Sequence, residues 1–360
     1  MDKIEIKGYK SIKNLSLELR QINILIGANG SGKSNLLSFF DMLQNLYRQN
    51  LQQYVAIQGG VDRFLYGGRK ITDCLYCHLY FGKNGYSITL EPGENSFIIS
   101  KEGLWYDHNP YYNNPHDISN YSMESRLSLA SVPRAGFIRH YLDALEKYHF
   151  HDTSRKSPFT HTSNIHSDAI RLYGRGENLA SFLYGIRKEN IVRYNLIVRT
   201  IQSIAPYFFD FYLEPNENGD IRLLWRDKYT SNIYSINDMS DGTKRFVALC
   251  VLFLQPKVPE TIIIDEPELG LHPSAISKLS GMIKSVAAKG CQVIAATQSV
   301  ELINYFEPKD IVTVDQTEEG SVFERLEDEE FHLWLEDYAV GDLWKQRIIT
   351  NGQPTKGGTR

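Results

Sequence analysis

The chain has 360 residues, and 39 Lys and Arg against 43 Asp and Glu give a formal net charge of −4. Hydrophobic residues make up 42% of the chain and charged residues 23%, which excludes a disordered or collagen-like protein. The longest wholly apolar run, Phe246 to Leu254, has nine residues, well short of the roughly 20 that a membrane-spanning helix needs. Met1 leads directly into an alternating strand pattern without a signal peptide. We therefore expect a cytoplasmic protein with no membrane partner.

Hydrophobic periodicity predicts the elements of the first half of the chain. It predicts strands over 2–9 and 21–27, a helix over 34–48, and a meander of short strands over 72–106. Residues 107–135 are rich in Asn, Ser, Tyr and Pro, which is typical of a long loop or insertion. A helix over 136–147 and an extended segment over 148–151 follow.

The second half ends in alternating strands and helices. A helical stretch at about 177–205 precedes a hairpin over 209–227. From residue 241 the predicted order is helix, strand 261–265, helix 274–288, strand 291–297, helix 299–306 and strand 310–315. This alternation indicates βαβ units in a largely parallel sheet. A last helix is predicted over 328–345, and residues 350–360 have the composition of a disordered tail.

A phosphate-binding motif stands between the second strand and the first helix. Gly27–Ser34 matches G-x-x-x-x-G-K-[ST] in full. Its glycines allow backbone N–H groups to converge on the phosphates of ATP, and the helix N-terminus adds the positive end of its dipole. Lys33 is expected to reach the β- and γ-phosphates, and Ser34 to ligate Mg²⁺. The residues expected to bind the nucleotide here are Asn29, Gly30, Ser31, Gly32, Lys33, Ser34 and Asn35.

Two adjacent acids end a second buried strand. The segment 261–264 is apolar after Thr261, and Asp265 and Glu266 follow it. Ligands bind at the carboxyl ends of parallel strands, so we expect this strand end beside the phosphate-binding loop. Asp265 is the expected Mg²⁺ partner, directly or through water, and Glu266 is the expected base that orients the attacking water. Lys33 and Glu266 are thus predicted to be catalytic in an ATPase.

A third motif precedes this strand and completes a family pattern. Ser240 stands 25 residues before Asp265 and is a good N-cap, whose neighbouring N–H groups can bind an anion. Together with the P-loop, the segments Ile4–Ile12, Ser240–Gly242 and Asp265–Pro273 resemble the RecF/SMC-type ATPases of the ABC class. Compact bacterial ATPases of that class share Gly176–Leu179, Thr297–Ser299 and Trp334–Tyr338. The resemblance covers nearly the whole chain, excepting 107–135 and 355–360.

The resemblance implies a dimeric mechanism. In ABC-class ATPases two nucleotide domains pair head to tail, and the signature serine of one contacts the γ-phosphate held by the other. Carried over, Ser240, Gly242 and Thr243 would act in trans on ATP cradled by Gly27–Ser34 of a second subunit. ATP binding would drive closure and hydrolysis would release it. A head-to-tail homodimer or a higher homo-oligomer is therefore expected.

Three departures from the family pattern bear on catalysis. The signature reads Met-Ser-Asp-Gly-Thr rather than the transporter-like Leu-Ser-Gly-Gly-Gln. The switch position, normally histidine, is Gln298, which can hydrogen-bond a phosphate or water but cannot carry a proton. We therefore predict a catalytic role for Gln298 and slow hydrolysis. The Q-loop glutamine has no clear counterpart, and His151 is the candidate substitute.

The fold class implied is an α/β P-loop NTPase with an ABC-type head, which has a mixed central sheet, an antiparallel β-subdomain and a helical lobe. We expect one split head over residues 1–360. Its nucleotide-binding core is predicted in 1–48 and 241–315, the β-meander in 72–106, and the insertion and helical lobe in 107–240.

Two functions remain open. One is an ATP-gated dimeric switch that controls a partner effector, a nuclease or toxin, in bacterial anti-phage defence. The other is a DNA-repair or recombination ATPase that binds DNA directly, so nucleic acid is a second candidate partner. Residues 315–343 hold eleven acidic residues and one basic residue, which fits a solvated face or a docking surface for a basic partner.

Overall fold

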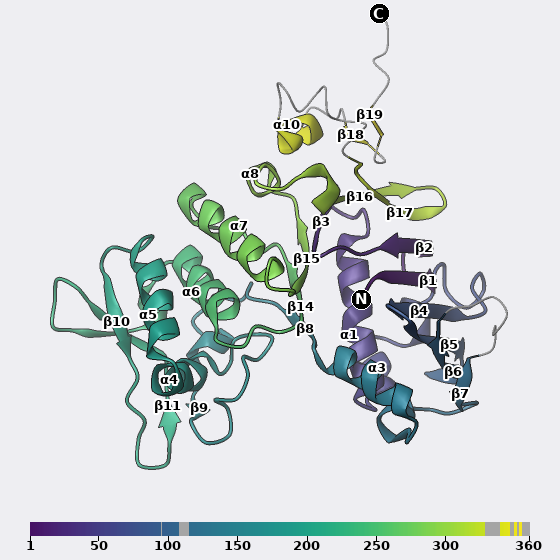
Figure 1. The fold of residues 1–360 in the computed structure, drawn as a ribbon, viewed down its shortest axis with the longest axis horizontal. Helices are drawn as coiled ribbons and strands as arrows, with labels where there is room; N and C mark the ends of the chain where they lie inside the picture. The colour runs from purple at the N-terminus through teal and green to yellow at the C-terminus, as the bar shows by residue number, and fades with distance from the viewer. Residues whose placement is uncertain (95, 108–114, 328–338, 346–348, 351–352, 355–360) are drawn as a thin grey trace, which may run out of the picture. The chain divides into compact units, whose positions relative to one another are not determined.

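The computed structural model describes residues 1–94, 96–107, 115–327, 339–345, 349–350 and 353–354. The chain divides into two compact units, of which the first combines Met1–Leu145 with Glu307–Arg360. The second unit is the continuous segment Glu146–Phe306. Both ends of the chain, purple and yellow in Figure 1, therefore contribute to the first unit.

An antiparallel sheet makes up much of the first unit. Its six strands are ordered β2-β1-β4-β5-β6-β7. They span Ile12–Glu18, Lys3–Tyr9, Leu75–Phe81, Asn84–Pro92, Phe97–Tyr106 and His116–Ser119. Ile6 and Cys77 are opposite each other on β1 and β4, and both are fully buried. Helices α2 (Leu51–Ile57) and α3 (Pro133–Asp143) contact β6 and β5, so the buried core lies between these helices and the sheet.

Three further strands of the first unit position the phosphate-binding loop. β3 (Ile22–Ile26) runs parallel to β16 (Ile311–Thr317), and β17 (Gly320–Arg325) pairs antiparallel with β16. This part of the unit is therefore a mixed sheet. Helix α1 (Lys33–Tyr47) follows the loop and buries one apolar face. The order strand, loop, helix around Gly27–Ser34 is the one that the motif requires.

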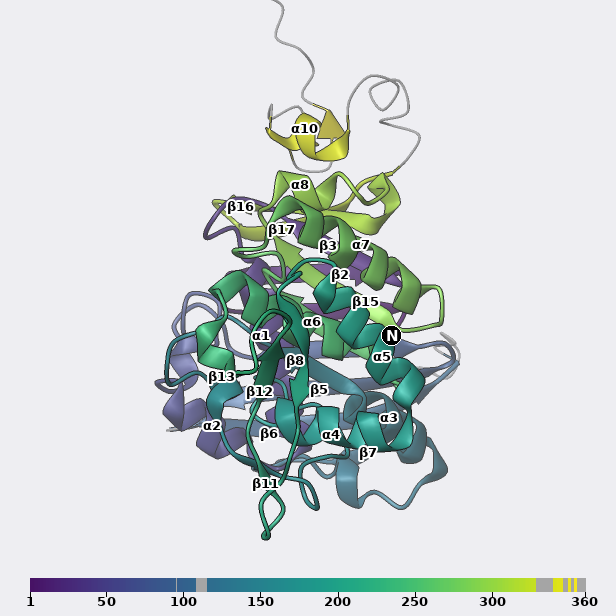
Figure 2. The same cartoon turned by 90° about the vertical axis from the view of Figure 1, so that its left-hand side faces the viewer.

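The second unit has parallel strands and a layer of helices. β14 (Thr261–Asp265) runs parallel to β15 (Gln292–Thr297), and β8 (Leu145–Tyr148) lies next to β14. Helix α6 (Asp241–Leu254) packs against α5 (Ile191–Gln202) and α7 (Pro273–Ala287), as Figure 1 shows. The remaining helices are α4 (Leu179–Glu189) and α8 (Val300–Ile303). Short strands form two small sheets. One contains β10 (Phe208–Tyr212), β12 (Leu224–Asp227) and β13 (Ile233–Ser235), and the other contains β9 (Ser163–Asn164) and β11 (Asp220–Ile221). Figure 2 labels β11, β12 and β13.

Several element boundaries differ from the predicted ones. The helical stretch at 177–205 is two helices, because Asn190 leaves the helical conformation and its side chain accepts a hydrogen bond from the Arg193 N–H at the start of α5. The helix predicted over 136–147 is α3, which ends at Asp143 because the next residues form β8. The segment predicted as a loop over 107–135 includes β7 and the start of α3. The prediction also lacks α2 and the strands β2, β9, β13 and β17.

The C-terminal predictions fall mostly outside the described residues. Of the helix predicted over 328–345, the structure describes the end, as α10 (Val340–Lys345). Of the tail predicted over 350–360, the structure describes residues 350, 353 and 354. They belong to two short paired strands, β18 (Ile349–Thr350) and β19 (Gln353–Pro354). In the part of the chain that the structure describes, no helix is both long enough and apolar enough to cross a membrane.

Glu102 on β6 is a fully buried acid in the first unit. Its carboxylate accepts hydrogen bonds from the Tyr86 hydroxyl at 2.7 Å, from the Ser125 hydroxyl, and from the Arg126 N–H at 2.9 Å. A buried charge is tolerated only with such partners. Glu102 therefore fastens the segment that follows β7 to the sheet.

The substitution Glu102→Ala is expected to lower the free energy of unfolding by about 3 kcal/mol, because three donors lose their acceptor. Urea denaturation measures the difference. Glu91→Ala, at an exposed acid of the neighbouring strand β5, is the control and should change the free energy by less than about 0.5 kcal/mol. Equal unfolding free energies for the two variants would contradict this role of Glu102.

Candidate functional site

The phosphate-binding loop lies in the first unit, between β3 and α1. Gly32 has a φ of 115°, a left-handed conformation that favours glycine. A Cβ atom there would lie 2.1 Å from the Ser321 Oγ, so β17 closes against the loop. Gly27 is also confined, since a Cβ on it would lie 2.1 Å from the Val314 carbonyl oxygen. Close packing therefore requires glycine at both positions, and the backbone conformation requires it at Gly32 as well.

Lys33 and Ser31 are buried polar residues of this loop. Lys33 is only 5% exposed, and its Nζ donates to the carbonyl oxygens of Gly27 at 2.7 Å and Ala28 at 2.9 Å. The Ser31 Oγ is buried and has no hydrogen-bond partner among the described residues. A buried hydroxyl without a partner beside a lysine suits the phosphate groups of a nucleotide.

The remaining predicted nucleotide-binding residues of the loop differ in their surroundings. Asn29, Gly30 and Ser34 are exposed. Asn35 is half-buried, and its side-chain amide donates to the Ser11 hydroxyl at 2.7 Å. Ser321 donates to the same hydroxyl at 2.7 Å, so Ser11 links the start of α1 to β17.

The two adjacent acids lie in the second unit, at the end of β14. The Glu266 N–H donates to the Ala296 carbonyl at 2.8 Å, which continues the pairing with β15. Glu266 itself has a φ of 37°, an uncommon conformation for a residue with a side chain. Its Oε1 accepts a hydrogen bond of 2.8 Å from the Gln298 amide. The structure thus brings the predicted base and the predicted switch residue into direct contact.

Glu268 is a second acid of this turn, which the sequence analysis did not single out. It is 8% exposed, its Oε1 accepts from the Thr297 hydroxyl, and its Oε2 has no partner among the described residues. Burial, reinforced by the charge of Glu266, raises the pKa of Glu268 to about 7. The sequence signal for Glu268 was its position two residues after Glu266. Its contact with Thr297 is seen only in the structure.

The signature residues form the N-terminus of α6 in the second unit. Ser240 is exposed and caps the helix, with its Oγ 3.3 Å from the Thr243 N–H and 2.8 Å from the Thr243 hydroxyl. A Cβ atom on Gly242 would lie 2.3 Å from the Gly270 carbonyl oxygen. The signature turn therefore packs directly against the turn that follows Glu268.

His151, the candidate for the Q-loop position, also reaches the acidic strand end. Its Nε2 lies 2.9 Å from the backbone carbonyl oxygen of Asp265. A small cavity lies behind the two acids. It is lined by Phe150, His151, Arg245, Leu249, Ile264, Asp265, Glu266 and Pro267. Within the second unit, Asp265, Glu266, Gln298 and His151 are thus neighbours, whereas the phosphate-binding loop belongs to the first unit.

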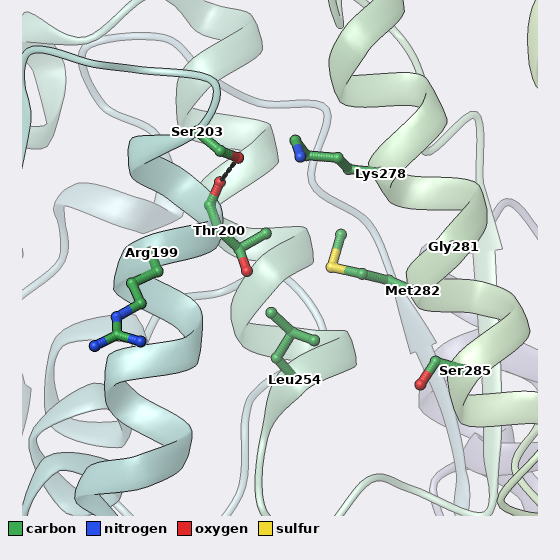
Figure 3. A pocket seen from close by; sticks show the side chains of 8 residues that line it. All are labelled: Arg199, Thr200, Ser203, Leu254, Lys278, Gly281, Met282 and Ser285. Carbon is green, nitrogen blue, oxygen red and sulfur yellow. Dashed lines mark hydrogen bonds between the residues drawn. The ribbon is translucent and has the colours of Figure 1, made fainter.

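A separate groove of about 350 Å³ lies between α5 and α7 (Figure 3). Its floor includes Leu254 and Met282, and its rim carries Arg199 and Lys278. None of the predicted site residues lines it. The groove is therefore distinct from the site built around the sequence motifs.

Comparison with solved structures shows the fold. A head domain of Smc bound to the C-winged helix domain of ScpA is 17% identical, covers 91% of this chain and 98% of its own, and gives a TM-score of 0.62. A Smc head with an extended coiled coil, bound to the C-terminal domain of ScpA from Pyrococcus furiosus, is 17% identical to this chain. It covers 93% of this chain and 98% of its own, and gives a TM-score of 0.58. These matches show that the chain has the fold of an ABC-type ATPase head.

Sequence relatives match shorter stretches. The energy-coupling factor transporter ATP-binding protein EcfA of Methanocaldococcus jannaschii is 35% identical over 78 residues, 21% of this chain and 27% of that protein. A putative ABC transporter ATP-binding protein of Streptomyces coelicolor is 35% identical over 65 residues, 18% of this chain and 11% of that protein. The chain thus spans about a quarter or less of the length of these two relatives.

A protein-family profile described as "AAA domain, putative AbiEii toxin, Type IV TA system" matches residues 22–304, most of the chain. That range includes the phosphate-binding loop, the signature turn, the acidic strand end and Gln298. The chain therefore belongs to this family of AAA domains, and it has the fold of an ABC-type ATPase head.

Proposed function

We propose that this chain binds ATP with Mg²⁺, hydrolyses ATP slowly, and acts as an ATP-gated dimeric switch that controls a partner effector, a nuclease or toxin, in bacterial anti-phage defence. The observation that carries the proposal is the 2.8 Å hydrogen bond between Gln298 and Glu266. It orients a carboxylate base without itself exchanging a proton. Such an arrangement suits controlled hydrolysis.

Each residue of the site has a proposed role in phosphoryl transfer. Lys33 would exchange its two loop carbonyls for phosphate oxygens, and Ser31 would donate its hydroxyl to a phosphate. Ser34 and Asp265 would supply oxygen ligands, which Mg²⁺ prefers, and the bound ion would neutralise charge on the phosphates. Glu266 would orient the attacking water and accept its proton as the bond to the γ-phosphate forms and ADP leaves.

The dimeric part of the proposal rests on the signature turn. Ser240 is exposed, and it begins a 14-residue helix whose first N–H groups suit an anion. We infer that Ser240, Gly242 and Thr243 complete the ATP site of a second subunit. ATP would then join two subunits, and hydrolysis would part them.

The biological part of the proposal draws on the family description and on charge. The family description includes the words "putative AbiEii toxin, Type IV TA system", which supports a role in controlling a harmful effector. The acidic stretch over 315–343 supports docking of a basic partner. The two Smc heads compared above are each bound to another protein, which supports partner binding by a head of this fold.

Glu266→Gln is expected to lower ATP turnover by at least about a hundredfold, because the base is lost while the side chain keeps its size. The same variant should accumulate as an ATP-bound dimer. Turnover assays and light scattering with ATP and Mg²⁺ measure the two effects. Glu189→Gln, at an exposed acid of α4, is the control and should behave like the wild type. A Glu266→Gln variant that stays monomeric with ATP would overturn the dimeric switch.

Two inactive variants are expected to restore activity when mixed. Lys33→Met removes the phosphate-binding lysine, and Ser240→Ala removes the signature hydroxyl. In a head-to-tail dimer of the two, one composite site retains both groups, so an equal mixture should recover turnover, with about a quarter of the wild-type value as the upper limit by random pairing. ATP turnover measured at several ratios of the Lys33→Met and Ser240→Ala variants tests this expectation. A mixture as inactive as its components, although shown to form mixed dimers, would mean that the signature acts within its own subunit.

The switch proposal also predicts no tight binding to duplex DNA by the purified protein at physiological salt, because the net charge of −4 supplies no general attraction for phosphates. Fluorescence anisotropy with a labelled duplex, with and without ATP, measures the affinity. Tight DNA binding together with DNA-stimulated hydrolysis would instead support the repair ATPase.

A further inference from the structure

Arg245 connects three motifs of the second unit. It lies on α6, five residues after Ser240. Its Nε donates to the Phe150 carbonyl at 3.2 Å, and its Nη2 to the His151 carbonyl at 2.9 Å. Its Nη1 donates to the Leu269 carbonyl at 2.8 Å. One guanidinium thus ties the signature helix to two segments that are far apart in the chain.

Both of these segments touch the acidic strand end. The His151 side chain reaches the Asp265 carbonyl at 2.9 Å, and Leu269 follows Glu266 by three residues. Arg245 also lines the small cavity behind Asp265 and Glu266. A displacement of Asp265 and Glu266 would therefore reach Arg245 by two routes, through His151 and through Leu269.

The signature turn and the turn after Glu268 pack so closely that there is no room for a side chain at Gly242. A Cβ atom on Gly242 would lie 2.3 Å from the Gly270 carbonyl oxygen, and a Cβ on Gly270 would lie 2.8 Å from the Arg245 Nη1. Lys244 adds a second anchor, since its Nζ donates to the Thr153 carbonyl at 2.8 Å. Tightly packed parts of a protein shift together rather than deform separately.

The geometry requires a guanidinium. Its planar fork carries five N–H donors and reaches several carbonyls at fixed angles. A lysine keeps the charge but is a point donor on a flexible stem, so it cannot hold two separate segments in the same way. A lysine at position 245 should therefore connect the signature helix less firmly to these two segments, even where the protein still folds.

We propose that Arg245 is a positioning residue that transmits the nucleotide state of Asp265 and Glu266 to the signature turn of the same subunit. Because that turn would serve the partner's ATP, the relay couples the two composite sites of the dimer. The inference rests on the proposed function, since coupling requires composite sites. Its consequence is cooperative ATP hydrolysis that depends on Arg245.

The test compares the full-length wild type with Arg245→Lys and Arg245→Ala. The affinity for a fluorescent ATP analogue with Mg²⁺ should stay within about threefold, because the phosphate-binding loop is untouched. Turnover should fall at least about tenfold, and the Hill coefficient for ATP should fall from near 2 to near 1. Arg199→Ala, at an exposed arginine of α5, is the control and should keep wild-type cooperativity.

A merely structural Arg245 would lower the melting temperature without changing the Hill coefficient, and this result would overturn the inference. Should Arg245→Ala fail to fold, Arg245→Lys decides the matter, since retained cooperativity in that variant would also overturn it. A cooperative wild type with equally cooperative Arg245 variants refutes the relay and leaves the dimeric switch intact. A wild type without cooperativity and without an ATP-dependent dimer refutes the proposed function and the relay with it.

Discussion

The second unit depends on the turn that runs from Asp265 to Leu271. Glu266 occupies a left-handed conformation at φ 37°, which costs on the order of 1–3 kcal/mol for a residue with a side chain. Such a conformation persists only where surrounding contacts over-determine it. Here the Gln298 amide, the Thr297 hydroxyl and the Arg245 guanidinium all bond to this turn. The conformational cost of the turn is thus offset by hydrogen bonds from α6, from the last residue of β15 and from Gln298, which follows it.

In the first unit the main constraint is the burial of the Lys33 ammonium group in the absence of a phosphate. Removing an ammonium group from water is costly unless acceptors are supplied. Gly27 and Ala28 supply them as backbone carbonyls, and Ser11 and Ser321 brace the loop from the other side. Under the proposed function, nucleotide binding would exchange these acceptors of Lys33 for phosphate oxygens rather than bury a new charge.

The loop Gly27–Ser34 and the residues around the acidic turn differ in how well they could be predicted from the sequence. The strand, the loop and the helix around Gly27–Ser34 could be predicted, because the motif lies in one contiguous segment. The contact between Gln298 and Glu266 could not, because it joins the ends of two strands 32 residues apart. Glu268 and Arg245 were missed for the same reason, since their partners belong to distant segments. The break at Asn190 was missed because a side-chain cap competed with a continuous helical pattern.

The sequence by itself determined the local chemistry of this protein: the glycines and lysine of the loop, the acids after an apolar strand, and the capping serine of α6. These follow from short-range pattern, since period, capping and motif spacing are properties of neighbouring residues. Only the tertiary structure decided which of these groups meet. It joins the two ends of the chain in the first unit and places His151, Arg245 and Gln298 around one acidic turn. The physical reason is that hydrogen bonds between distant segments depend on how strands and helices pack, and no local pattern encodes that packing.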